Sequence, residues 1–236
     1  MEADPVAWFE DLARHDVPSV GGKNASLGEL VRNLAAQGVA VPPGFATRAD
    51  AYWAFVEKNG LRKLVEGELR ALAAGSATLA EAGQAIRRAF RRGAWPDDIA
   101  QAIRRAYRAL SQRIGVSAAS VAVRSSATAE DLPEASFAGQ LESFLNVAGE
   151  DALLEACKRC YASMFTDRAI SYRAAKGFDH LEVAVSVGVQ KMVRADIGGA
   201  GVMFSIDTET GFDKIVVINA GWGLGENVVQ GEIDPD

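Results

Sequence analysis

The spacing of apolar residues changes at Ser120, and this change limits the fold of the 236-residue chain more than any other feature. Before Ser120 the apolar residues recur at helical intervals, whereas after it short apolar runs alternate with turn residues. The later runs cover residues 182–193, 201–206 and 214–219. Helices followed by antiparallel hairpins predict an α+β fold rather than a doubly wound parallel sheet.

Local signals place the helices of the first half. The buried stripe of the first predicted helix consists of Leu27, Leu30, Val31 and Leu34. Thr47 with Asp50, and Thr78 with Glu81, have the spacing of a capping box, so each pair predicts a helix start. Pro96 predicts the start of a further helix. The predicted helices end at Gly38, Gly60, Gly93 and Gly115.

The second half begins with a short predicted strand over residues 121–123. A polar loop is predicted over 125–140, and a second strand over 144–147. Helices are predicted over 150–164 and 167–175, before the strand-like remainder of the chain.

Composition and charge exclude several classes of protein. Two cysteines, no basic run before an apolar stretch at the N-terminus and no apolar run of about 20 residues predict a cytoplasmic protein without a signal peptide or membrane span. The net charge is −6, yet residues 60–113 carry eleven basic and five acidic residues. Because these arginines lie between helical apolar positions, they predict a solvated helix face rather than a nucleic-acid surface.

Gly21-Gly22-Lys23 directly precedes the first predicted helix. Glycines allow the backbone to approach a ligand closely, and a helix N-terminus attracts anions. The segment is not a P-loop, because Val17 and Asn24 stand where that motif needs Gly and Ser or Thr. The pattern alone leaves two interpretations: an anion site that uses Lys23, or a plain loop with a solvated lysine.

Arg124 follows the predicted strand over 121–123 and precedes two serines. A guanidinium can donate two hydrogen bonds to a phosphate, but it can equally form a structural ion pair. The small-residue segment 136–143 can cover phosphates with backbone N–H groups, or it can be a surface loop. Both alternatives stay open for each segment.

Two further motifs fail on their spacing. Residues 221–226 follow a predicted strand, but a dinucleotide fingerprint needs Gly at position 226 or 228, so a strand-end turn with Trp222 packed in the core is predicted. Cys157 and Cys160 form C-x-x-C within a predicted helix, without a second cysteine pair. They predict two thiols on one helix face rather than a zinc or redox site.

Taken together, these segments resemble the N-terminal ATP-grasp domain of the phosphoenolpyruvate synthases (pyruvate, water dikinases), within the wider pyruvate phosphate dikinase family. The resemblance covers nearly the whole chain and is most specific over residues 123–146. The blocks that carry it are residues 20–30, 41–45, 123–133, 137–140, 190–193 and 221–236.

The resemblance implies an ATP-grasp fold that is C-terminally incomplete in this chain. Residues 1–185 would form the first lobe, and residues 186–236 the hinge strand and the start of the second lobe. Lys23 and Arg124 would hold ATP phosphates. The Mg²⁺ ligands would lie beyond Asp236.

The remaining contacts implied by the resemblance surround the nucleotide. Gly139 and Ser143 would lie in the loop that covers the phosphates. Gln190 would lie on the hinge strand beside the adenine. The edge of the base would be read by backbone groups of Lys191, Met192 and Val193.

The family's reaction converts ATP, pyruvate and water to phosphoenolpyruvate, AMP and phosphate through a phosphohistidine. The resemblance implies that the phosphohistidine domain and a pyruvate-binding barrel are separate partner domains, and that no residue of this chain is itself catalytic. It also allows a homodimer. Three alternatives stay open: the ATP domain of a rifampicin-type antibiotic phosphotransferase, that of a pyruvate phosphate dikinase, and a catalytically silent nucleotide-binding module.

Overall fold

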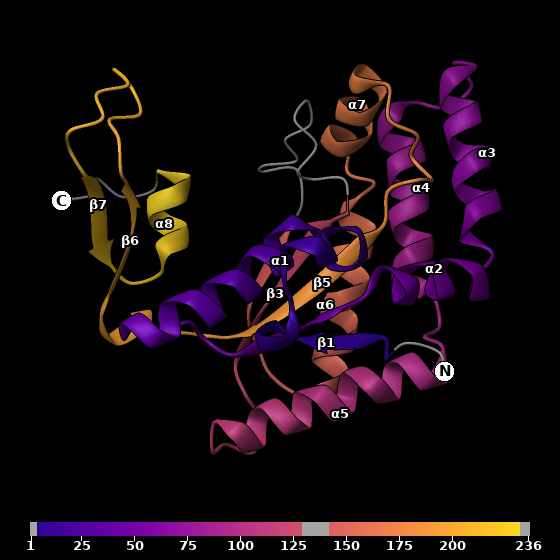
Figure 1. Ribbon diagram of the computed structural model, residues 1–236. Coiled ribbons are helices and arrows are strands. Elements are labelled where there is room, and N and C mark those ends of the chain that lie inside the picture. Colours follow the sequence, from indigo (N-terminus) through magenta and orange to yellow (C-terminus); the bar gives the residue numbers. More distant parts are fainter. Residues whose placement is uncertain (1–3, 129–141, 232–236) are drawn as a thin grey trace. The chain divides into compact units, whose positions relative to one another are not determined.

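A computed structural model describes residues 4–128 and 142–231 of the chain (Figure 1). The chain divides into two compact units, Met1–Met192 and Val193–Asp236. The helices of the first unit are α1 (Val17–Leu34), α2 (Ala49–Lys58), α3 (Leu61–Ala73), α4 (Leu79–Arg92), α5 (Asp97–Arg113), α6 (Glu150–Ser163) and α7 (Asp167–Lys176). Its strands are β1 (Val6–Trp8), β2 (Gly44–Thr47), β3 (Val121–Ala127), β4 (Ser143–Val147) and β5 (Val185–Lys191). Helices and an antiparallel sheet confirm the predicted α+β class.

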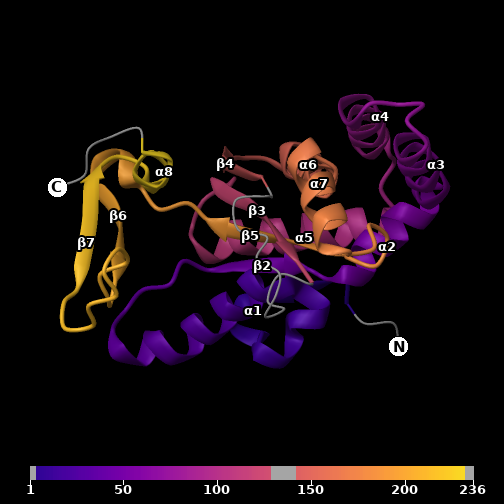
Figure 2. The same cartoon turned by 90° about the horizontal axis from the view of Figure 1, so that it is seen from above.

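The five strands of the first unit form one sheet in the order β1-β2-β5-β3-β4, and every neighbouring pair is antiparallel. One face of the sheet is apolar and the other carries small or polar residues. The apolar face includes Phe45, Val121, Val123, Val187 and Val189. The small-residue face includes Ala46, Ala122, Ser126, Ser186 and Gly188. α6 packs on the apolar face and α1 on the small-residue face (Figure 2).

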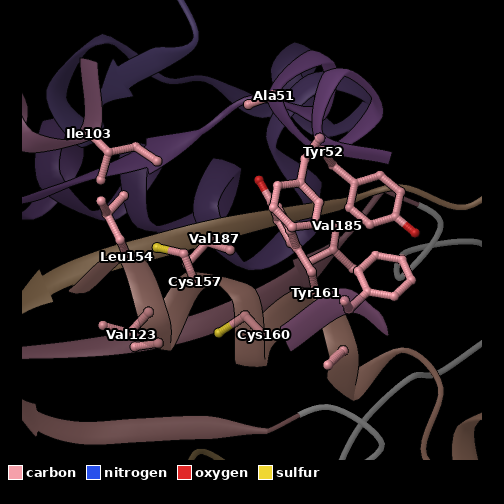
Figure 3. Packing of buried hydrophobic residues seen from close by; sticks show 14 of the residues in the cluster. Ala51, Tyr52, Ile103, Val123, Leu154, Cys157, Cys160, Tyr161, Val185 and Val187 are labelled. Carbon is pink, nitrogen blue, oxygen red and sulfur yellow. The ribbon is translucent and has the colours of Figure 1, made fainter. Parts of the chain in front are cut away.

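The main core lies between the apolar face of the sheet and the helices packed on it. Cys157 and Cys160 of α6 point into this core among Val123 and the two tyrosines Tyr52 and Tyr161 (Figure 3). Both thiols are buried and free, and burial raises the pKa of Cys157 to about 12. The prediction of two thiols on one helix face is therefore confirmed.

The second unit consists of a two-stranded antiparallel ribbon and a short helix. These elements are β6 (Gly199–Phe204), β7 (Val217–Trp222) and α8 (Gly225–Gln230). Trp222 is paired with Gly199 across the ribbon, and its side chain is 83% exposed. The prediction that Trp222 packs in the core is wrong, because α8 contacts the ribbon without burying this side chain.

Two other predictions about the first unit are wrong. Thr47 does not cap α2, because it belongs to β2 and its Oγ1 accepts a hydrogen bond from the Val187 amide at 3.0 Å. The strand predicted over 121–123 continues to Ala127, since its backbone pairs with β5 as far as Val185. The polar loop therefore begins after Ala127 rather than at Ser125.

The helices that were predicted agree with the structure to within a few residues, but α3 was not among them. Thr78 and Glu81 form the predicted capping box at the start of α4. In the first predicted helix, Leu27, Val31 and Leu34 are half-buried but Leu30 is exposed. Its buried face consists of small residues, Ala25 and Gly28 among them, because they fit against the small-residue face of the sheet and the preceding segment.

The arginines of residues 60–113 lie on helix surfaces, as predicted. Arg104 pairs with Asp151 at 2.6 Å and with Glu150 at 3.3 Å, and Arg108 also reaches Glu150. In the part of the chain that the structure describes, no helix combines the length and the hydropathy that a membrane crossing requires.

Candidate functional site

A pocket on the small-residue face of the sheet brings together three residues that the sequence singled out, Lys23, Arg124 and Gln190. They come from α1, β3 and β5, which lie next to one another in the first unit (Figure 1). The rest of the pocket lining consists of Phe9, Asn24, Leu27, Ser125 and Gly188. Two cations more than 100 positions apart in the sequence thus share one hollow.

Gly21 marks a kink in α1, two residues before Lys23. It interrupts the helical backbone with φ 73° and ψ 162°, so the chain turns there and a new helical segment begins just before Lys23. A Cβ at residue 21 would overlap the Ser126 side chain and would lie 2.6 Å from the Ser126 carbonyl oxygen. This close approach is to strand β3. The residue pattern had instead suggested approach to a ligand.

Asn24 fixes the same turn of α1 on the sheet. Its Nδ2 donates to Ser186 Oγ at 2.8 Å and to the Val20 carbonyl oxygen at 3.0 Å. Ser186 Oγ in turn donates to the Thr47 carbonyl oxygen at 2.6 Å. Asn24 is almost fully buried, and the Asn24 side chain occupies the place that a side chain at residue 188 would fill.

Arg124 lies in the middle of β3, opposite Ser143 on one side and Gly188 on the other. Its neighbours along the strand are buried, but its own side chain is exposed. Among residues 4–128 and 142–231, no ion pair includes Arg124, so the structural ion-pair interpretation has no partner there. The exposed Arg124 side chain is one of the groups that line the pocket.

Ser143 and Gly139 are the two residues predicted for the loop that covers the phosphates. Ser143 is the first residue of β4, exposed and directly opposite Arg124. Gly139 lies outside the described residues. Ser143 thus comes near one phosphate-binding candidate through strand pairing.

Residues 190–193 are the segment that the resemblance assigns to the hinge and the adenine edge. Gln190 pairs with Gly44 and Ala122, and its side-chain Nε2 donates to the Pro42 carbonyl oxygen at 3.1 Å. The Lys191 amide donates to the Pro43 carbonyl oxygen and the Met192 amide to the Ser120 carbonyl oxygen, both at 2.9 Å. The exposed Val193 begins the second unit.

Metal ligands do not gather among the described residues: no group of three His, Cys, Asp or Glu side chains there is placed to hold a metal ion. His180 makes a structural hydrogen bond: its Nδ1 accepts from Arg173 Nε at 2.9 Å. Burial, and then the Arg173 charge, lower the pKa of His180 to about 4. The ring is therefore a neutral acceptor near pH 7.

Asn24 and Gly188 are among the pocket residues that were not singled out from the sequence. The contact between Asn24 and Gly188 joins positions 164 apart. Asn24 lies in the block 20–30 that carries the family resemblance, but no sequence spacing links it to Gly188. The local signal for Asn24, a polar residue in the first turn of an apolar helix, was weak because that position is usually solvated.

The sequence matches known proteins along nearly all of its length. Residues 17–236 match the family described as pyruvate phosphate dikinase, AMP/ATP-binding domain. The chain is similar to phosphoenolpyruvate synthases of Aquifex aeolicus (51% identical over 98% of this chain and 27% of the relative) and Escherichia coli (53%, over 98% and 29%). A third, from Synechocystis, is 52% identical over 98% of this chain and 29% of the relative. The chain thus spans less than a third of the length of these relatives.

Proposed function

Because the chain belongs to the pyruvate phosphate dikinase family of AMP/ATP-binding domains, we propose that its pocket on β3 and β5 is where ATP phosphates bind. The observation that carries the proposal is the convergence of Lys23 and Arg124 on one hollow. Two fixed cations offset the charge of a polyphosphate, and a guanidinium adds directional hydrogen bonds. The N–H groups of the helical segment that begins at the Gly21 turn favour an anion at the same end.

The other predicted contacts are part of the same proposal. Ser143 would donate its hydroxyl to a phosphate beside Arg124, and Gly139 would contribute backbone N–H groups. Gln190 to Val193 would border the adenine. Since the Lys191 and Met192 amides already donate to protein carbonyls, adenine contacts from this segment would use carbonyl oxygens or the Val193 amide.

We propose an ATP-grasp fold in which residues 1–185 form the first lobe and residues 186–236 the hinge strand and the start of the second. The family and the α+β architecture of the first unit support it. Mg²⁺ would accompany the phosphates and offset part of their charge. The described residues offer no cluster for this ion, so its protein ligands are not assigned to them.

The full-length protein would be a cytoplasmic phosphoenolpyruvate synthase, which forms phosphoenolpyruvate, AMP and phosphate from ATP, pyruvate and water. The support is identity near 50% to relatives of that name across this domain. In this proposal the chain binds ATP, and a phosphohistidine domain and a pyruvate-binding barrel elsewhere in the protein carry the phosphoryl group onward.

ATP-dependent thermal protection tests the phosphate site in the full-length protein. We expect ATP to raise the unfolding temperature, and Lys23→Ala or Arg124→Ala to remove most of that rise because each removes a cation from the pocket. Lys63→Ala and Arg88→Ala are matched controls that remove the same charges from exposed positions of α3 and α4. Equal protection in all four variants would contradict the site.

Turnover tests the proposed activity separately. The full-length protein is expected to convert ATP to AMP and phosphate only when pyruvate is present. Turnover with a rifamycin in place of pyruvate would indicate the antibiotic phosphotransferase instead. ATP binding without turnover on either acceptor would indicate a silent nucleotide-binding module.

A further inference from the structure

We infer that Asn24 is a positioning residue, which sets the distance between Lys23 and Arg124 by occupying the side-chain place that Gly188 leaves empty. The inference rests on the proposed function, because it concerns how the two phosphate-binding cations are held together. The contact joins α1 to the strand beside Arg124.

Strand register supplies the first step. Gly188 of β5 is the direct partner of Arg124 of β3. Side chains of directly opposed residues in an antiparallel pair project from the same face and are close neighbours. A side chain at residue 188 would therefore stand beside that of Arg124, on the face covered by α1.

Packing supplies the second step. A Cβ at residue 188 would overlap Asn24 Oδ1, so the Asn24 side chain occupies this vacant place. Lys23 is the residue before Asn24, and both line the same pocket as Arg124. The absence of one side chain thus lets the backbone of α1 approach the sheet next to Arg124.

Hydrogen bonding supplies the third step. Asn24 Nδ2 donates both to the sheet, at Ser186 Oγ, and to its own helix, at the Val20 carbonyl oxygen. Ser186 is itself fixed by its bond to the Thr47 carbonyl oxygen of β2. A buried side chain with two such bonds restricts both the height of α1 above the sheet and its rotation. The position of Lys23 over the sheet is restricted in the same way, since Lys23 is the residue next to Asn24.

A comparison of ATP with adenosine separates positioning from general stability, because adenosine lacks the phosphates that Lys23 and Arg124 would bind. In the full-length protein we expect Asn24→Ala to weaken ATP binding about tenfold and to leave adenosine binding unchanged. Ser186→Ala, which removes the sheet-side acceptor, should weaken ATP binding by a smaller factor. Gly188→Ala should act like Asn24→Ala, because its methyl group displaces the amide.

Ser111→Ala is the matched control. It removes two buried hydrogen bonds, to the Tyr107 carbonyl oxygen and from the Ala119 amide, at residues outside the pocket lining. It should lower the unfolding temperature without changing the ratio of ATP to adenosine affinity. Asn24→Ala would fail as a positioning variant if it weakened both ligands equally, or neither.

A double-mutant cycle distinguishes failure of this inference from failure of the proposed function. In the Lys23→Ala background, Asn24→Ala should cause little further loss of ATP affinity, because the lysine that it positions is gone. Additive losses would overturn the positioning role and leave the phosphate site standing. Unchanged ATP affinity in Lys23→Ala itself would overturn the proposed site, and the inference with it.

Discussion

Gly21 shows how one residue determines where the candidate site is built. Its backbone conformation, φ 73° and ψ 162°, is one that only glycine adopts readily, and strand β3 leaves no room for a Cβ. Both constraints act on the turn that carries Lys23. The same residue therefore fixes the fold of α1 and the direction of the lysine.

Gly21→Ala is expected to lower the free energy of unfolding by about 3 kcal/mol or more, from backbone strain together with overlap at Ser126. Gly38→Ala is the matched control, since Gly38 has φ 78° but no atom within 4 Å of an added Cβ. Its expected cost is about 1 kcal/mol, from backbone strain alone. Denaturant unfolding measures both, and equal costs would argue against close packing at Gly21.

Arg173 and His180 form a second constraint at the scale of single residues. Arg173 is fully buried, and burial lowers its pKa to about 10. Besides His180, the guanidinium donates to the Met164 carbonyl oxygen and lies 5.4 Å from the ring centroid of Phe165. Protonation of His180 would place a second positive charge against this buried cation.

The stability of the protein should therefore fall as the pH drops from about 6.5 towards 4. The folded pKa of His180, about 4, lies below its usual value of 6.5, so the unfolded chain takes up the proton first. Because the ring is only half-buried, the expected loss is about 1–2 kcal/mol. His180→Gln keeps an acceptor but does not titrate, so the difference in unfolding free energy between the two proteins should shrink with acidification. A pH-independent difference would contradict this account.

At the scale of elements, two pairs of residues with the same spacing form different structures. Thr78 and Glu81 form a capping box, with the Thr78 amide donating to Glu81 Oε2 at 2.8 Å. Thr47 and Asp50 have the same spacing, but Thr47 bonds to Val187, 140 positions later in the chain. Local spacing predicts a helix cap only where the capping side chain does not hydrogen-bond to a distant strand instead.

Substitution of the acidic residue in each pattern tests this difference. Glu81→Ala should lower the free energy of unfolding by about 1 kcal/mol, because it removes a capping partner at the start of α4. Asp50→Ala should cost less than about 0.5 kcal/mol, since only the interaction with the helix dipole of α2 is lost. Thermal unfolding of both variants measures the contrast, and a larger cost at Asp50 would contradict it.

The candidate site was partly predictable for a similar reason. Lys23 and Arg124 stand out locally, one before a helix and one beside a strand, and the family resemblance joined them. The register that places Gly188 opposite Arg124, and hence Asn24 beside it, arises only when β3 and β5 pair. The spacing of residues in the sequence does not reveal this contact between Asn24 and Gly188, because it forms only when the sheet does.

At the scale of the whole molecule, the two units differ in how much structure supports them. The first has a five-stranded sheet packed on both faces, whereas the second has a two-stranded ribbon with Met203, Ile218 and Trp222 exposed. A ribbon of two strands is marginally stable by itself. The chain spans only 27–29% of the length of the relatives compared above.

The most direct test of the central claim is calorimetric titration of the full-length protein with ATP and with adenosine, before and after Arg124→Ala. If Arg124 binds phosphate in the pocket that it shares with Lys23, the variant should lose at least tenfold in ATP affinity and retain its affinity for adenosine. An Arg124→Ala protein that binds ATP as tightly as the parent would contradict the claim that this pocket holds the phosphates.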